Sequence, residues 1–109
     1  MMLVIEARPA WGPVMVLEIH NVHEDTRMST VIEIEVSAAR EALETWDWSL
    51  KPIKLGDDIV IHQSGVVISR PGQSTIITER DEDADVIGET MEALAEAIDQ
   101  INQTKGTNE

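Results

Sequence analysis

Apolar and polar residues alternate along several short stretches of this chain, which is the pattern of strands that bury one face. The clearest stretch spans 31–37, where alternate apolar side chains point to one side and two glutamates point to the other. Residues 14–22 alternate in the same way, and residues 2–7 form a shorter apolar run. The polar segment 23–30 is expected to be a loop. The first third of the chain therefore predicts three strands.

The middle of the chain predicts three further strands in succession. They cover 59–62, 66–69 and 74–79, all rich in isoleucine, valine and threonine or serine. A turn at 63–65 separates the first two, and Pro71-Gly72 provides turn chemistry between the second and third. Because both connections are short, antiparallel pairing is the simplest arrangement.

Two stretches predict helices. Ser37 is placed to cap a helix over 38–46, a segment rich in alanine, leucine and glutamate. Towards the C-terminal end, apolar residues recur every three or four positions, which places them in one stripe of a long helix. This stripe consists of Ile87, Met91, Leu94, Ile98 and Ile101. The polar residues 102–109 are expected to form a frayed tail.

These elements indicate a single compact α+β domain over residues 1–101. The simplest architecture is a mostly antiparallel sheet of about five to six strands, with two helices packed on one face and the long helix at the C-terminal end. The apolar residues of the later strands lie on both sides of the pleat, so the second face is not wholly polar, and a homodimer that buries it through Val60, Val67 or Ile77 is an open alternative. The apolar residues in question are Val60, Val66, Val67, Ile68, Ile76 and Ile77.

Charge and composition narrow the classes of function. The chain has 109 residues, with 21 Asp and Glu against 8 Lys and Arg, and its formal net charge is −13 at pH 7. Such a surface repels DNA and anionic membranes, so direct contact with nucleic acid or membrane is not expected. The absence of cysteine excludes disulfides and thiolate metal sites. No apolar run reaches the length of a membrane span and the first residues do not resemble a signal peptide, so a cytoplasmic protein is expected.

The acidic residues concentrate near the C-terminal end. Residues 79–99 contain nine carboxylates and a single basic residue, Arg80. With helical geometry, five of the acids form a row opposite the apolar stripe, and no Lys or Arg interrupts that row. Neighbours in such a row lie about 5–6 Å apart, a spacing similar to that of successive phosphates in a nucleic acid. The predicted acidic surface comprises Asp81, Glu82, Asp83, Asp85, Glu89, Glu92, Glu96 and Asp99.

Two interpretations of this acidic row remain open. It is either the ordinary solvated face of an amphipathic helix or a surface that docks on a basic protein. A helix stabilised only by its own side chains would carry Lys or Arg four residues from its acids, and this one does not. The sharpest hypothesis is an inhibitor that mimics nucleic acid and blocks a DNA- or RNA-binding protein, as small phage or mobile-element proteins do. The alternative is a small homo-oligomeric assembly subunit that uses an apolar sheet face.

The acidic run also partly matches a calcium-binding loop. The residues at loop positions one, three, five, nine and twelve are all acids: Asp81, Asp83, Asp85, Glu89 and Glu92. Position six, which requires glycine for a sharp turn, holds Val86, and the apolar position eight holds Gly88. We therefore do not expect a calcium site here.

Other candidates for chemistry are weaker. His20 and His23 lie near two acids, but in a strand they leave opposite faces, so surface histidines at a strand end are favoured over a metal site. Ser64 lacks the glycines of a nucleophile elbow. Glu33 and Glu35 share a strand face, which is common on exposed strands. No metal, no other cofactor and no catalytic activity are expected.

Tryptophan is the only aromatic residue type in the chain, at Trp11, Trp46 and Trp48. Buried indoles add bulk to a core of isoleucine and valine, whereas exposed ones often supply much of the energy of a binding surface. The sequence favours core or edge positions for Trp46 and Trp48. If both lie in extended chain they share one side and form a two-ring anchor, so they are also candidate partner-binding residues.

Overall fold

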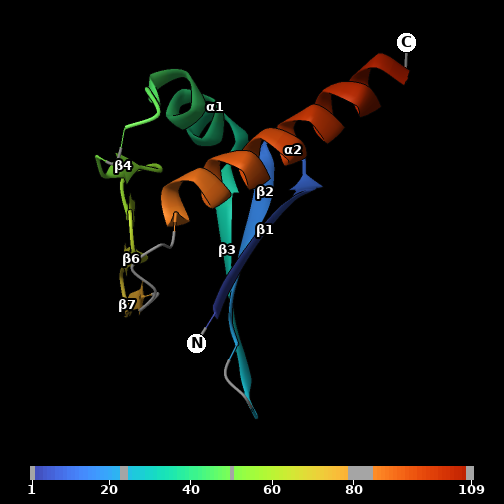
Figure 1. Cartoon of the computed structure of the whole chain (residues 1–109). Helices are drawn as coiled ribbons and strands as arrows, with labels where there is room; N and C mark the ends of the chain where they lie inside the picture. The colour runs from blue at the N-terminus through green and yellow to red at the C-terminus, as the bar shows by residue number, and fades with distance from the viewer. Residues whose placement is uncertain (1, 23–24, 50, 79–84, 108–109) are drawn as a thin grey trace.

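The computed structural model describes residues 2–22, 25–49, 51–78 and 85–107. These residues form β1 (Met2–Trp11), β2 (Val14–Val22), β3 (Arg27–Glu35), α1 (Val36–Thr45), β4 (Ile53–Lys54), β5 (Ile59–His62), β6 (Gly65–Arg70), β7 (Gln73–Thr78) and α2 (Val86–Thr107). The strands make two antiparallel sheets, one in the order β1-β2-β3 and the other in the order β4-β5-β6-β7. Figure 1 shows α2 crossing over the three-stranded sheet, with the four-stranded sheet beside it.

The α+β class predicted from the sequence is confirmed, but the prediction of one sheet with five to six strands is wrong. The strands before and after α1 pair only within their own group. Each group is amphipathic, and the buried residues of both groups belong to one hydrophobic core. The apolar faces of the two sheets are therefore buried in a shared core. Alternating apolar residues are expected in this arrangement and in one continuous sheet alike, so the pattern does not distinguish the two.

The three-stranded sheet has one apolar and one polar face. β2 is its central strand, and Leu17 lies opposite Ala7 on β1 and Ile32 on β3. On the other face Glu6 lies opposite Glu18, and His20 lies opposite Ser29. The apolar face supplies the buried residues Leu3, Met15, Leu17, Ile19, Ile32 and Ile34 to the core.

Two strands of this sheet are longer than the hydrophobic pattern predicts. β1 continues through Pro9 to Trp11, which is possible because β1 is an edge strand and needs no second partner for its backbone. β3 begins at Arg27, which pairs with Val22, so residues 27–30 are strand rather than loop. Backbone pairing with β2 extends these strands into segments whose side chains show no apolar alternation.

The predicted cap of the first helix is also wrong. α1 begins at Val36, its N-cap residue is Glu35, and no side chain caps it. Ser37 lies inside the first turn, and its hydroxyl donates to Oε2 of Glu35 at 3.3 Å. The backbone amide of Val36 instead donates to the carbonyl of Pro13 at 2.8 Å, so the β1–β2 turn satisfies the start of the helix.

The predicted meander is confirmed in the four-stranded sheet, with turns between β5 and β6 and between β6 and β7. Its faces differ from the expectation at one position. Ile77 pairs with Val66, and both side chains are buried in the core. The outer face instead carries Val60, Val67 and Ile76, which lie opposite one another across three strands.

The long helix confirms the predicted apolar stripe and completes the core. Ile87, Met91, Leu94 and Ile98 are buried, while Ile101 is half-buried. α2 packs mainly on β1 and also contacts β5 and α1. The helices therefore close a core that both sheets share, instead of covering one face of a single sheet as predicted. The helix continues to Thr107, through residues that the sequence places in a polar tail.

Arg70 at the end of β6 joins the two sheets. Its Nε donates to Oδ2 of Asp58 at 2.7 Å, and its Nη2 donates to the backbone carbonyl of Glu33 on β3 at 2.6 Å. The carbonyl belongs to the edge strand of the other sheet, so one guanidinium group satisfies an acceptor that strand pairing leaves open.

Candidate functional site

The start of α2 is set by an aspartate. The Oδ1 atom of Asp85 accepts a hydrogen bond from the backbone amide of Gly88 at 2.9 Å, which is N-cap geometry. A side chain at Gly88 would collide with the carboxylate of Asp85, so glycine at this position leaves room for the cap. The calcium prediction does not fit this segment, because Val86 and the residues after it are helical instead of forming a loop. Asp81 and Asp83 lie outside the described residues.

The acidic residues of α2 lie on its solvent-facing side. Glu89, Glu92, Glu96 and Asp99 are exposed, opposite the buried apolar stripe. Among the described residues, the ion pairs involve Glu6, Glu18, Asp58 and their basic partners, and none reaches Glu92, Glu96 or Asp99. Asp99 accepts a hydrogen bond from Gln103 at 3.1 Å. The predicted acidic face is therefore present on the helix, except for Asp81, Glu82 and Asp83, which lie outside the described residues.

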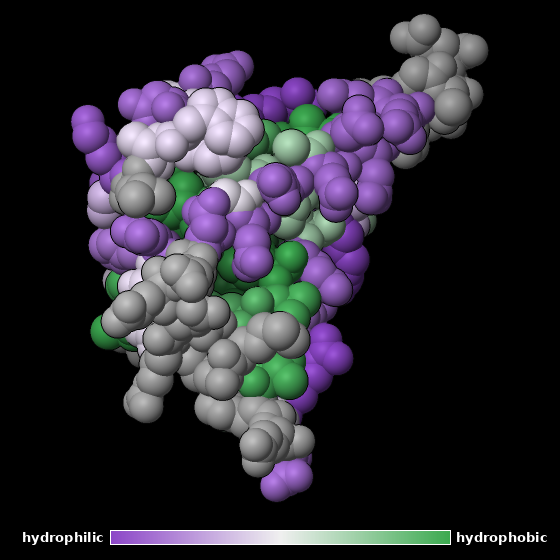
Figure 2. Space-filling view, in the orientation of Figure 1, coloured by the Kyte–Doolittle hydropathy of each residue, from purple (hydrophilic) through white to green (hydrophobic). Residues whose placement is uncertain are grey.

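A groove runs between this helix and the edge strand β1. Its floor is apolar, formed by Leu3, Val4 and Ile5 of β1 together with Ala93 of α2, and its volume is about 370 Å³. The remaining lining residues are Glu89, Glu92 and Glu96. We call these seven residues the acidic groove. In the space-filling view, polar side chains follow α2 and a band of hydrophobic surface lies below them (Figure 2).

The two candidate tryptophans stack on each other but differ in exposure. Their ring centroids are 4.1 Å apart with planes inclined by 32°. Trp46 is half-buried and packs against the core, as predicted for an edge position. Trp48 is 78 % exposed, so the core or edge prediction is wrong for this residue. Its φ of 66° lies in the left-handed region, which is unfavourable for a tryptophan.

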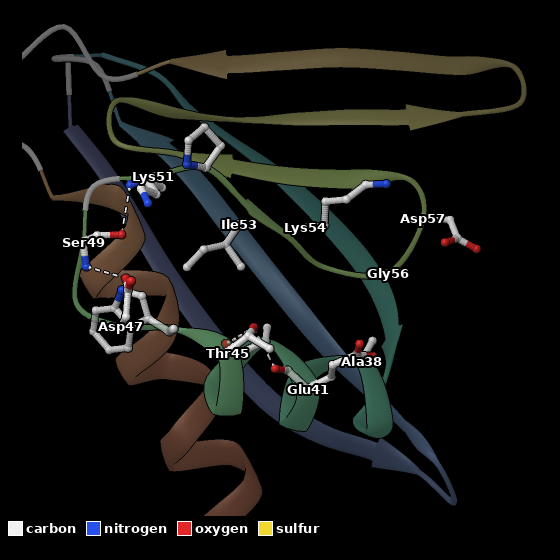
Figure 3. Close-up of a pocket in the computed structure, with 13 residues that line it drawn as sticks. Ala38, Glu41, Thr45, Asp47, Ser49, Lys51, Ile53, Lys54, Gly56 and Asp57 are labelled. Atoms are coloured by element: carbon white, nitrogen blue, oxygen red, sulfur yellow. Dashed lines mark hydrogen bonds between the residues drawn. The ribbon is translucent and has the colours of Figure 1, made fainter.

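A second cavity lies next to the tryptophans. It has a volume of about 490 Å³ and is bordered by α1, by the connection after it and by β4 (Figure 3). Its charged lining residues have both signs: Glu41, Asp47 and Asp57 are acidic, and Lys51 and Lys54 are basic. This balance distinguishes the cavity from the acidic groove.

Asp47 shapes the chain beside this cavity. Its Oδ1 accepts the backbone amide of Ser49 at 3.1 Å, and hydrogen bonds from Ser49 lower the pKa of Asp47 below its ordinary value. Asp47 is exposed, so these hydrogen bonds belong to a local turn and do not mark a buried catalytic acid.

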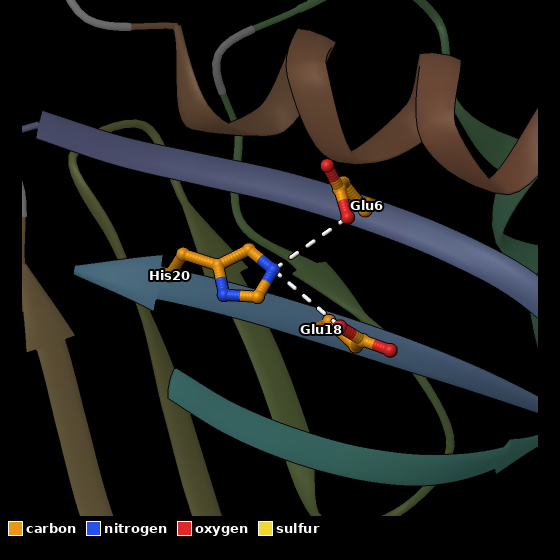
Figure 4. A group of neighbouring side chains, drawn as sticks. All are labelled: Glu6, Glu18 and His20. Carbon is orange, nitrogen blue, oxygen red and sulfur yellow. Dashed lines mark ion pairs between the residues drawn. The ribbon is translucent and has the colours of Figure 1, made fainter. Parts of the chain in front are cut away.

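One cluster was missed by the sequence reasoning. His20 is buried, at 7 % exposure, instead of lying at the surface as predicted. Its imidazole lies on the polar face of the three-stranded sheet, with Glu6 and Glu18 beside Nε2 (Figure 4). Glu6 comes from a neighbouring strand, so only the register of β1 against β2 brings it to the histidine. His23, the second histidine considered, lies outside the described residues.

Comparison of the chain with protein-family models, with curated proteins and with solved structures finds no match. Within the described residues, neither α1 nor α2 is both long and apolar enough to cross a membrane. The proposals below therefore rest on the geometry and charge of this chain alone.

Proposed function

We propose that this chain is a non-catalytic interaction protein that docks on a basic protein surface through the acidic groove. The observation that carries this proposal is the lining of the groove: three glutamates border an apolar floor, and no Lys or Arg is among the lining residues. A partner that inserts an apolar side chain onto the floor and places Lys or Arg beside the glutamates would satisfy both parts of the groove.

The charge of the chain also attracts a basic partner at long range. The chain carries a net charge of −13, and the exposed acids of α2 lie on one face of one helix. Complementary charge accelerates the encounter and selects the partner more than it raises affinity. The attraction is screened by salt, since the Debye length falls from about 10 Å at 0.1 M to about 3 Å at 1 M.

The finer form of the proposal is an inhibitor of a nucleic-acid-binding protein. A row of carboxylates about 5–6 Å apart along a helix presents regularly spaced negative charge, as a nucleic-acid strand does. A groove that binds phosphates with Lys and Arg would accept such a row. This form predicts that the partner releases its nucleic acid when this chain binds.

Capture from a cell lysate at low salt, followed by elution in a salt gradient, tests the proposal. The affinity of the captured partner for purified variants of this chain is then measured by calorimetry. The variant Glu89→Lys, Glu92→Lys, Glu96→Lys is expected to lose binding by at least a hundredfold while retaining its circular dichroism spectrum.

The control must change the net charge equally without touching the groove. Glu33→Lys, Glu41→Lys, Glu44→Lys alters three exposed acids on β3 and α1, so both triple variants have the same net charge. The control is expected to bind within about threefold of the unchanged chain, the residual loss coming from long-range electrostatics. Equal losses in both variants would show that overall charge, and not the groove, drives binding.

A specific observation favours a second candidate, a homo-oligomeric assembly subunit. Val60, Val67 and Ile76 form a row across the outer face of the four-stranded sheet, and Ile76 is 72 % exposed. Self-association through this row would persist at high salt and would be lost in Val67→Lys or Ile76→Lys. A sedimentation mass of one chain at micromolar concentration would remove this candidate.

A further inference from the structure

Three side chains of types that ligate metals converge on the polar face of the three-stranded sheet, next to the acidic groove. Glu6 and Glu18 border a pocket together with Ala93 and Glu96 of that groove. We propose that Glu6, Glu18 and His20 bind a divalent metal ion, Zn²⁺, between β1 and β2. Their nearest ligand atoms lie within 4.8 Å of one another. This proposal is independent of the docking function.

The strand register builds the cluster. Glu18 and His20 are two positions apart on β2, so they project from the same face, and Glu6 on β1 lies directly opposite Glu18. Nε2 of His20 is 3.4 Å from Oε2 of Glu18 and 3.6 Å from Oε2 of Glu6. Figure 4 shows both carboxylates beside the same ring nitrogen.

These separations fit tetrahedral coordination. Zinc binds histidine nitrogen and carboxylate oxygen at about 2.0–2.2 Å, so two ligand atoms of one tetrahedron lie about 3.3–3.6 Å apart. A direct hydrogen bond between the same atoms would be shorter, at about 2.7–3.2 Å. The observed distances therefore fit an ion between the groups better than direct contact.

The histidine itself points to a ligand. Its side chain is only 8 % exposed, and Nε2 is fully buried without a hydrogen-bond partner in the described part of the chain. Nδ1 lies 2.7 Å from the hydroxyl of Ser29 on β3. When Nδ1–H donates to Ser29, Nε2 carries a lone pair that faces two carboxylates, and a cation is the group that all three can accept.

The surroundings hold the carboxylates ready. Arg8 contacts the far oxygen of Glu18, with Nη2 2.6 Å and Nε 3.0 Å from Oε1, which leaves Oε2 directed at His20. Glu6 is 62 % exposed at its side chain, so one side of the cluster is open to water. Two carboxylates, one imidazole and one water complete the four ligands that zinc takes.

Zinc would tie the edge strand to the centre of the sheet. Glu6 is on β1, the two other ligands are on β2, and Ser29 extends the connection to β3. Because the ligands meet only in the folded sheet, binding is expected to raise the melting temperature.

Titration of the untagged full chain with ZnCl₂ at pH 7.5 tests the proposal by calorimetry. We expect Glu6→Gln to weaken zinc binding at least tenfold, and we expect a similar loss in His20→Gln. Ser29→Ala is expected to weaken binding about tenfold, as is typical when a group that orients a ligand is removed. Glu6→Gln changes the most exposed ligand, so it keeps the result interpretable if His20→Gln fails to fold.

Matched control variants show whether zinc binds at this cluster or at other acidic residues of the chain. His62→Gln removes a half-buried histidine of β5, and Glu33→Gln removes an exposed carboxylate from the same face of the three-stranded sheet. Both are expected to bind zinc within twofold of the unchanged chain. Replacement by Co²⁺ adds a spectroscopic signature, since tetrahedral coordination gives visible absorption that Glu6→Gln should lose.

Two results would overturn the proposal. In the first, Glu6→Gln and His20→Gln bind zinc as the unchanged chain does, which would place the ion on other acids. In the second, calorimetry of the unchanged chain shows no zinc binding, and the cluster is then only a contact between His20 and two carboxylates.

Discussion

Arg70 links the two sheets, and its removal offers a direct measure of how strongly they are joined. The change Arg70→Met keeps the apolar stem of the side chain and removes the guanidinium group. It breaks the ion pair with Asp58 and the hydrogen bond to the carbonyl of Glu33. Asp58 lies 12 residues away, between β4 and β5 of the same sheet, whereas Glu33 lies 37 residues away on β3, so the second contact is the one that joins the sheets.

The expected magnitude follows from the exposure of each contact. The side chains of Arg70 and Asp58 are 29 % and 35 % exposed, so their ion pair is screened and contributes about 0.5–1 kcal/mol. The hydrogen bond from a charged donor to the Glu33 carbonyl contributes about 1.5 kcal/mol. We expect Arg70→Met to lower the free energy of unfolding by about 2 kcal/mol, a shift of roughly 8–16 °C in the melting temperature.

Urea unfolding followed by circular dichroism measures this loss, and a double-mutant cycle divides it. The cycle compares Arg70→Met, Asp58→Asn and the combination of the two. A coupling energy of about 1 kcal/mol or less is expected, because the carbonyl of Glu33 accounts for the rest. If Arg70→Met changed stability by less than about 0.5 kcal/mol, the guanidinium would not join the sheets and the reasoning would be wrong.

Three further predictions concern local structure. Asp85→Ala is expected to destabilise the chain by about 1 kcal/mol in urea because the amide of Gly88 loses its cap, while Asp85→Asn should cost less than half of that. Gly65→Ala is expected to cost more than 2 kcal/mol, since its Cβ would collide with a backbone carbonyl of β7 that cannot move; unchanged stability would contradict the β6–β7 pairing. Because hydrogen bonds from Ser49 lower the pKa of Asp47, the turn should be fully formed above the unfolded-state pKa of about 3.9 and should weaken as the pH falls through the lower folded value; an NMR titration of Asp47 with its midpoint at or above 3.9 would refute this.

Much of the secondary structure could be predicted because it depends on near neighbours. The 3.6-residue period of Ile87, Met91, Leu94 and Ile98 requires one buried helix face, and that face is buried as predicted. The short turns of the meander allow little besides antiparallel pairing. The ends of elements were less predictable: β3 begins at Arg27 because pairing with β2 continues where its own side chains show no apolar pattern.

The candidate sites also differ in how far the sequence could predict them. The acidic face of α2 is a property of one helix, so spacing along the sequence predicts which of its carboxylates lie together. The cluster of Glu6, Glu18 and His20 required the register of two strands, and the pair Glu18 and His20 was the only local signal. The positions of Trp46 and Trp48 depended on the backbone after α1, where Trp48 adopts a positive φ and is exposed.

By itself, the sequence determined the α+β class, the meander, the amphipathic C-terminal helix and the excess of negative charge. Each of these features follows from the periodicity of one segment or from the overall composition, and neither depends on contacts between distant segments. Only the tertiary structure decided that the strands form two sheets, that Arg70 joins them, and that an acidic groove lies between α2 and β1. Alternating apolar residues require a buried face but do not specify what buries it, and that choice is made by contacts between segments distant in the chain.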